Sequence, residues 1–120
     1  MNTNAFDFRV EIDHAPGDVC VIAVHGEVDL FTAPELKTAA QRELDGGAVR
    51  VVVDLTGTTF LDSTALGVLI GLTKRVRPEG GDVVVVNTEP TTTKTFEITG
   101  LDEVFKVVST RDEALAALAP

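Results

Sequence analysis

The chain has a single cysteine and few basic residues. Cys20 cannot form an internal disulfide and lies among strand-forming residues, so we interpret it as a small buried hydrophobe rather than a reactive thiol. Ten Lys and Arg against 19 Asp and Glu give a net charge of -9. This balance argues against nucleic-acid and anionic-membrane partners, because binding to phosphates depends mainly on clustered basic side chains.

Long apolar runs, repeats and linkers are also missing from the sequence. No stretch approaches the ~20 apolar residues needed to span a bilayer, and residues 1–4 lack the basic-then-apolar pattern of a signal peptide. We therefore expect a cytoplasmic protein. A length of 120 residues with 44% hydrophobic content suits one core. We predict a single domain over residues 1–120, with an ordered core at about 5–118.

The first part of the chain has the pattern of a β-hairpin followed by a helix. Apolar and charged residues alternate over 6–12, which predicts an edge strand with one wet face. After a turn at 14–18, the apolar run at 19–24 should pair antiparallel with it. Thr32 then has the spacing of an N-cap with a capping box to Glu35, which predicts a helix over 33–44.

The sequence is organised around residues 50–77. Val51-Val52-Val53 predicts a strand that is buried on both faces, because the usual apolar and polar alternation is lost. A polar turn follows at 56–59, and a helix begins at Asp62-Ser63, where either side chain can cap the free backbone amides. Apolar residues cover more of this helix than one core-facing stripe requires, which suggests a second contact surface.

The remaining segments complete an α/β pattern. The apolar runs at 83–86 and 104–108 predict strands, and 90–99 and 112–118 predict helices. Alternating helices and strands imply right-handed crossovers between parallel strands. We therefore predict a small mixed β-sheet opened by a β-hairpin, with about four helices packed mainly on one face.

Several motifs in a fixed order resemble one family. They are Gly26-Glu27-Val28-Asp29 before the first helix, residues 60–67 (FLDSTALG) at the start of the second, the Gly80-Gly81 turn, and residues 96–101. Over nearly the whole chain, this order is similar to STAS domains, in particular bacterial anti-sigma factor antagonists. Ala65 departs from the pattern, since the family most often has glycine there, and this change bears on partner fit rather than on the fold.

The resemblance implies a phosphorylation switch at Ser63. The unphosphorylated protein would bind an anti-sigma factor serine kinase and release a sigma factor, and phosphorylation of Ser63 by that kinase would abolish binding. A phosphatase would act on phospho-Ser63. Without the resemblance, Ser63 is interpreted as a plain N-cap. The competing function is a STAS-type scaffold or ligand-sensing module, as in stressosomes or transporter-associated domains, in which Ser63 is only structural.

The predicted partner surface combines the loop at 26–32 with the exposed side of the helix that begins at Asp62. Its predicted residues are Asp29, Thr32, Asp62, Ser63, Thr64, Ala65, Val68, Gly71 and Leu72. Three alternatives remain open: an Asx turn for Asp29, a purely capping role for Thr32, and a core position for the apolar helix residues. The edge strand at 6–12 is less suitable, because charged residues there guard against strand addition. We expect a monomer or a weak dimer.

Catalytic and cofactor motifs are missing. Ser63 lacks the Gly-x-Ser-x-Gly context of a hydrolase, and both histidines, His14 and His25, lie in the opening hairpin. The sequence has neither a phosphate-binding loop nor a dinucleotide motif. One cysteine, two separated histidines and scattered carboxylates do not predict a metal site. We therefore expect a binding protein without catalytic residues, cofactor or metal.

Overall fold

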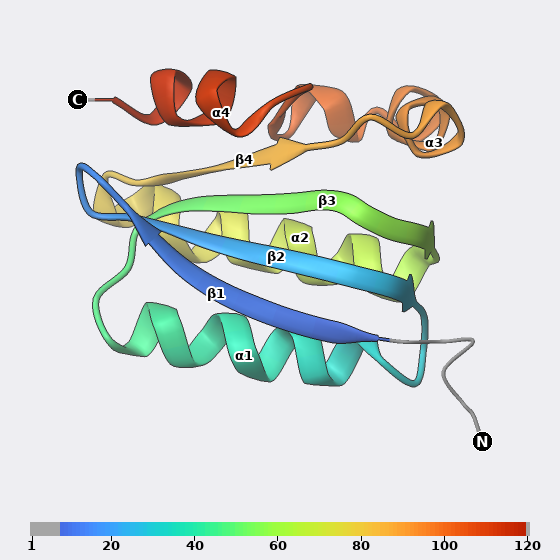
Figure 1. The fold of residues 1–120 in the computed structure, drawn as a ribbon, viewed down its shortest axis with the longest axis horizontal. Helices are drawn as coiled ribbons and strands as arrows, with labels where there is room; N and C mark the ends of the chain where they lie inside the picture. Colours follow the sequence, from blue (N-terminus) through green and yellow to red (C-terminus); the bar gives the residue numbers. More distant parts are fainter. Residues whose placement is uncertain (1–7, 120) are drawn as a thin grey trace.

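The computed structural model describes residues 8–119, which form a five-stranded mixed sheet with four α-helices and two short 3-10 helices (Figure 1). The strands are β1 (Arg9–Ala15), β2 (Val19–Val28), β3 (Arg50–Leu61), β4 (Asp82–Val86) and β5 (Lys106–Val108). The helices are α1 (Ala33–Asp45), α2 (Ser63–Val76), α3 (Pro90–Thr99) and α4 (Arg111–Leu118). Strand order follows the chain, with β1 antiparallel to β2 and all later neighbours parallel. The predicted α/β architecture is confirmed.

The opening hairpin is longer than predicted. Phe6 and Asp7 lie outside the described residues, but β1 continues to Ala15, so His14 belongs to the strand rather than to the turn. A short turn suffices because Gly17 and Asp18 adopt positive φ angles of 84° and 59°. The charged residues of β1 are exposed, and its apolar residues pack against the core.

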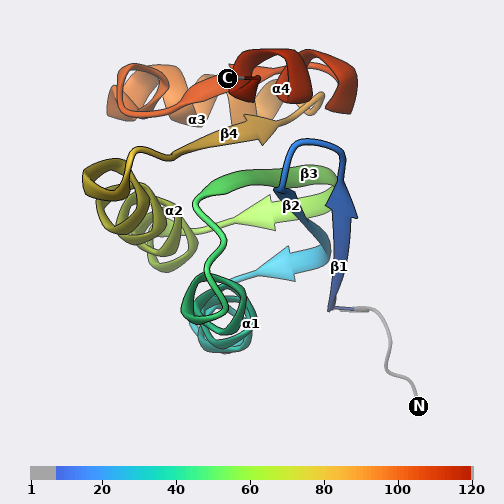
Figure 2. The ribbon, with the colours of Figure 1, turned by 90° about the vertical axis from the view of Figure 1, so that its left-hand side faces the viewer.

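Helices cover both faces of the sheet, but unequally. Val51 and Val53 of β3 face the large core under α1, α2 and α3, whereas Val52 faces a smaller cluster with Ala114 and Leu118 of α4. Successive residues of a strand point to opposite faces, so the whole valine run is buried. Figure 2 shows α1 and α2 together on one side of the strands. The predicted arrangement of helices mainly on one face holds, with α4 on the other.

The prediction of a turn at 56–59 is wrong, because β3 continues through these residues to Leu61. β2 also extends beyond its predicted end, to Val28, and pairs with β3 as far as Val28 and Leu61, with two register irregularities on the way. Thr58 adds a hydrogen bond from its hydroxyl to the carbonyl of Val24 at 2.9 Å. Threonine suits a strand once a neighbouring strand supplies partners. Both strands therefore end level with each other, next to α1 and α2.

Among residues 8–119, none of the helices combines the length and the apolar character needed to cross a membrane.

Candidate partner-binding site

Ser63 is the first residue of α2, and Asp62 caps the helix. The Asp62 backbone is extended, and its carboxylate accepts a hydrogen bond from the amide of Ala65 at 3.1 Å. The Ser63 side chain is exposed, and the structure shows no hydrogen bond from its hydroxyl to another described residue. The interpretation of Ser63 as the cap is therefore wrong. Its exposed hydroxyl lies at the positive end of a helix dipole.

The segment between β2 and α1 is a tight turn held by Asp29. One carboxylate oxygen of Asp29 accepts hydrogen bonds from the amides of Phe31 at 2.9 Å and Thr32 at 3.1 Å. The Asx turn considered for Asp29 is thus confirmed. The side chain still lies at a partly exposed position, so a partner-binding role for Asp29 stays a prediction.

Thr32 supports this turn instead of capping α1 with its side chain. Its hydroxyl accepts from the amide of Asp29 and donates to the carbonyl of Glu27, both at 2.9 Å. It forms no side-chain cap, and the predicted capping box with Glu35 is wrong. Thr32 has helical backbone angles, φ -100° and ψ -24°, rather than the extended ones that direct an N-cap oxygen toward the first turn.

The Asp29 turn and the start of α2 lie side by side. Val28 pairs with Leu61 in the sheet, and the amide of Asp62 donates to the carbonyl of Val28 at 3.1 Å. Asp29 and Asp62 therefore follow the carboxyl ends of neighbouring parallel strands, the edge at which open α/β sheets usually bind their ligands. The structure brings together the two motifs that lie more than 30 residues apart in the sequence.

A groove of about 600 Å³ runs between α1 and α2 from this edge. Thr64, Val68 and Gly71 line it from α2, as predicted for a partner surface, and Pro34 and Lys37 line it from α1. Gly71 contributes to its width, since a Cβ built there meets nothing within 4 Å. The groove is an open surface with an apolar floor rather than an enclosed cavity.

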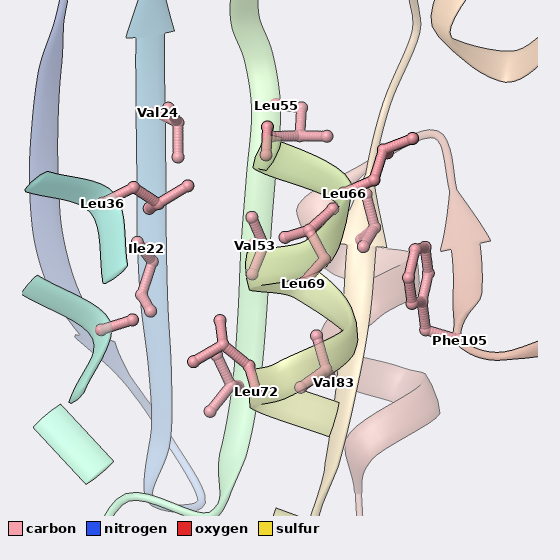
Figure 3. Packing of buried hydrophobic residues seen from close by; sticks show 14 of the residues in the cluster. Ile22, Val24, Leu36, Val53, Leu55, Leu66, Leu69, Leu72, Val83 and Phe105 are labelled. Carbon is pink, nitrogen blue, oxygen red and sulfur yellow. The ribbon is translucent and has the colours of Figure 1, made fainter. Parts of the chain in front are cut away.

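Two predicted partner residues belong to the core. Ala65 is fully buried, and Leu72 is 4% exposed. Figure 3 shows Leu72 beside Leu69 of α2, among core side chains of the sheet. Leu72 lines the groove, but because it is buried it offers a partner little accessible surface. Their burial favours the core position that the sequence left open, because helical spacing alone does not tell how far the neighbouring helix covers the face.

Sequence reasoning missed the exposed apolar residues around this site. Phe31 is 85% exposed and Leu30 62% exposed in the Asp29 turn, and Phe60, two residues before Asp62, is 49% exposed. The sequence did contain a signal for this exposure. Leu30 and Phe31 are adjacent apolar residues in a short turn between a strand and a helix start, and side chains in such a turn cannot easily pack into the core. Large exposed apolar side chains beside a groove are typical of protein interaction sites.

Asp54, in β3 on the α4 side of the sheet, has a structural role. One of its carboxylate oxygens accepts from the amide and hydroxyl of Thr56 at 2.9 and 2.5 Å, and the other accepts from Arg111 of α4 at 2.6 Å. Burial favours a raised pKa, but these hydrogen bonds outweigh it and hold the pKa of Asp54 below its usual value. Asp54 therefore joins β3 to α4 and holds the backbone at Thr56.

A family model described as "STAS domain" matches residues 9–114. The chain belongs to the STAS domain family. The anti-sigma-B factor antagonist of Listeria monocytogenes is 32% identical over 107 residues, covering 89% of this STAS chain and 94% of the Listeria protein. The crystal structure of an anti-sigma factor antagonist from Mycobacterium paratuberculosis has a TM-score of 0.85 at 32% identity, over 92% of this chain and 93% of that one.

The STAS fold is also that of more distant solved structures. The Bacillus cell fate determinant SpoIIAA in its phosphorylated form has a TM-score of 0.71 at 21% identity, over 91% of this chain and 98% of that one. At this identity the likeness concerns the fold alone. The Asp29 turn, the start of α2 and the groove between α1 and α2 thus lie on an established STAS framework.

Proposed function

We propose that this protein is an anti-sigma factor antagonist and that phosphorylation of Ser63 controls its binding to an anti-sigma factor serine kinase. In this scheme the unphosphorylated protein binds the kinase, which then releases a sigma factor. The names of the Listeria and Mycobacterium relatives support the class of protein. The exposed hydroxyl of Ser63 beside a capping Asp62 is the observation that carries the switch.

The position of Ser63 explains how phosphorylation acts on the partner and spares the domain. A phosphoryl group adds about -1.5 to -2 charge, and the amides and dipole at the start of α2 favour an anion there. The cap is retained because it comes from Asp62. A hydrated dianion on a partly apolar surface, close to the Asp29 turn, must be desolvated for docking, and this penalty weakens the complex.

The docking surface in this proposal is the Asp29 turn with the α1–α2 groove. Phe31 is the apolar anchor, and Val68 lies in the floor of the groove. Polar and charged side chains, Thr64 and Lys37 among them, surround this small apolar centre. A modest apolar core with a polar rim is typical of non-obligate complexes, which suits a partner that must be released. Catalysis belongs to the kinase, and a phosphatase reverses the modification.

The test is incubation of the protein with its cognate anti-sigma factor kinase and Mg-ATP, followed by peptide mass spectrometry. We expect one phosphoryl group on the peptide containing Ser63, and none on Ser63→Ala. Ser109→Ala is the matched control, because it removes the other serine, which lies outside the groove lining, and should still be modified. Modification at another residue, or unmodified Ser63 in a protein that binds the kinase, would contradict the switch and favour a scaffold or ligand-sensing role.

A further inference from the structure

A histidine, a cysteine and a glutamate side chain meet at the end of the molecule opposite the Ser63 site. His14 of β1 lies directly across from Cys20 of β2, and Glu43 comes from the last turns of α1. Figure 1 places the β1–β2 turn and the end of α1 at one end of the sheet and the start of α2 at the other. The donor atoms of the three residues all lie within 4.8 Å of one another. The sequence did not predict a metal site, because these residues are far apart along the chain, and the fold brings three of them together.

The spacing of these atoms fits one small metal ion. His14 Nε2 is 3.1 Å from a carboxylate oxygen of Glu43, and Cys20 Sγ is 3.8 Å from the same oxygen. Bond lengths to tetrahedral zinc imply donor separations of roughly 3.4–3.6 Å. These two distances therefore need to change by only a few tenths of an ångström, and the His14 and Cys20 donor atoms lie within 4.8 Å of each other. The His14 side chain is 72% exposed and free to make such an adjustment.

We propose that His14, Cys20 and Glu43 form a binding site for a divalent transition metal, with Zn²⁺ as the preferred ion and a water molecule in the fourth position. One sulfur, one imidazole nitrogen and one carboxylate oxygen are a donor set typical of zinc and unsuited to Mg²⁺ or Ca²⁺, which take oxygen ligands. All three residues line a surface hollow of about 610 Å³, which gives the ion and its water access.

Charge and protons balance in this site. Burial, and then the neighbouring Glu43 carboxylate, raise the pKa of Cys20 to about 11, so the metal-free protein carries a thiol there. Coordination forms the metal–sulfur bond and releases the thiol proton to solvent, as metal binding to cysteine generally does. The thiolate and carboxylate then offset the double charge of the ion. Two arginines, Arg42 and Arg50, also line the hollow, and Arg50 donates a hydrogen bond to the Gly17 carbonyl.

The bound ion would fasten the end of α1 to the opening hairpin, independently of the switch at Ser63. In its absence, Glu43 accepts hydrogen bonds from Cys20 and, in one tautomer, from His14. The three residues are therefore already positioned before the metal arrives. Such preorganisation lowers the cost of binding, because few side-chain rotations must be frozen.

The experiment uses the full chain without an affinity tag, treated with a chelator and then titrated with Co²⁺ or Zn²⁺ alone. We expect one Co²⁺ per chain, with a thiolate-to-cobalt charge-transfer band and the intense visible bands of tetrahedral cobalt. Zn²⁺ should displace Co²⁺ and raise the melting temperature. Absence of the charge-transfer band, or binding of more than one ion with equal affinity, would overturn the proposal.

Variants separate this site from adventitious binding. His14→Gln and Glu43→Gln should each lower Zn²⁺ affinity at least about tenfold in calorimetry, and Cys20→Ser should abolish the charge-transfer band. His25→Gln is the matched control, because it removes the second histidine, which pairs with Glu11 outside the cluster. Cys20 is buried, so Cys20→Ser risks misfolding. The deciding variant is therefore His14→Gln, because the His14 side chain is exposed. Equal Zn²⁺ affinity of His14→Gln and wild type would refute the site.

Discussion

At the scale of single residues, two neighbouring side chains at the start of α2 have different roles. The Asp62 carboxylate caps the helix by accepting a hydrogen bond from the amide of Ala65, whereas the Ser63 hydroxyl makes no hydrogen bond to any other residue in the described range 8–119. A modification of Ser63 can therefore change the surface without removing the cap. Asp29 differs, because its carboxylate orders the turn that displays Phe31. An Asp29 substitution thus affects both the shape of the turn and its charge.

We predict that Ser63→Asp weakens binding to the anti-sigma factor kinase at least about tenfold, or 1.4 kcal/mol, and leaves the fold intact. The carboxylate suits the helix start but not the docking surface. Ser63→Ala should bind like wild type and resist phosphorylation. Calorimetric titration measures the affinity, and circular dichroism checks the fold. Ser109→Asp, at the only other serine, controls for added charge. Equal affinity of Ser63→Asp and wild type would contradict the charge mechanism.

Phe31 is the second residue with a testable role. We predict that Phe31→Ala lowers affinity for the kinase by about 1–3 kcal/mol, in the range of interface anchors, with an unchanged melting temperature because the ring is 85% exposed. Ile98→Ala is the matched control. Ile98 is 75% exposed in α3 and lies outside the residues that line the groove. A larger loss of affinity with Ile98→Ala would move the docking surface to α3.

At the scale of helices and strands, α2 serves two surfaces at once. Leu69 and Leu72 anchor it in the core, and Gly67 and Gly71 expose its other side and widen the groove next to α1. Two glycines within one helix lower its intrinsic stability, by about 1 kcal/mol each relative to alanine. The two glycines that widen the groove therefore lower the helix propensity of α2.

Filling the groove should separate stability from binding. We predict that Gly71→Ala stabilises the protein by about 0.5–1 kcal/mol, since the new methyl group meets nothing within 4 Å, and that it lowers affinity for the kinase. Thr38→Ala, at an exposed position of α1 outside the groove lining, should leave affinity unchanged. Chemical denaturation and calorimetry measure the two effects. Unchanged affinity of Gly71→Ala would show that the groove is not part of the interface.

The link between β3 and α4 is the second feature at this scale. Asp54 joins these elements through Arg111, and its pKa is lowered in the folded protein. The folded state then binds a proton less readily than the unfolded state. The stabilisation is therefore present above the unfolded pKa of about 3.9 and is lost as pH falls through the lower folded value.

We predict that Asp54→Ala destabilises the protein at pH 7 by about 1–3 kcal/mol, because Arg111 and the Thr56 amide lose their acceptor. The difference between wild type and variant should shrink as the pH falls from about 5, through the unfolded value of about 3.9, towards the lower folded pKa. Denaturant unfolding across this pH range measures it. Asp112→Ala, which removes an exposed carboxylate next to Arg111 in sequence, is the control. A constant difference across the range would show that the Asp54 charge has no part in stability.

At the scale of the whole molecule, the sheet separates two functional ends. The carboxyl ends of β2 and β3 carry the Asp29 turn and Ser63, and the cluster of His14, Cys20 and Glu43 lies at the amino end of β2. The exposed face of β1 carries the charged residues Arg9 and Glu11, which pair with each other. This edge strand is thereby protected against recruiting another strand.

We predict that kinase binding perturbs residues 29–37 and 62–75 and leaves β1 unchanged. NMR shift mapping or amide hydrogen exchange of the complex tests this distribution. Ser63→Asp at the same concentrations is the control and should show a reduced response in both segments. Perturbation centred on residues 9–15 would instead indicate strand addition at β1 and would contradict the interface proposed here, even with Ser63 phosphorylated.

Local patterns in the sequence were enough for much of the fold. The valine run of β3 predicted burial on both faces, the residues at Asp62 predicted the start of α2, and the helix at 90–99 has the predicted bounds. These features depend on side-chain periodicity, caps and breakers within about ten residues of each other. The ordered motifs also sufficed for the family, since the STAS match spans residues 9–114.

Only the tertiary structure decided which side chains are covered and which meet. The threonines at 56–59 became strand because β2 lies alongside, and Leu72 became core because α2 packs onto the sheet. Phe31 stayed exposed because the Asx turn directs it away from the core. His14, Cys20 and Glu43 converged through hairpin register and the packing of α1. Burial and convergence depend on partners distant in sequence, about which local periodicity carries no information.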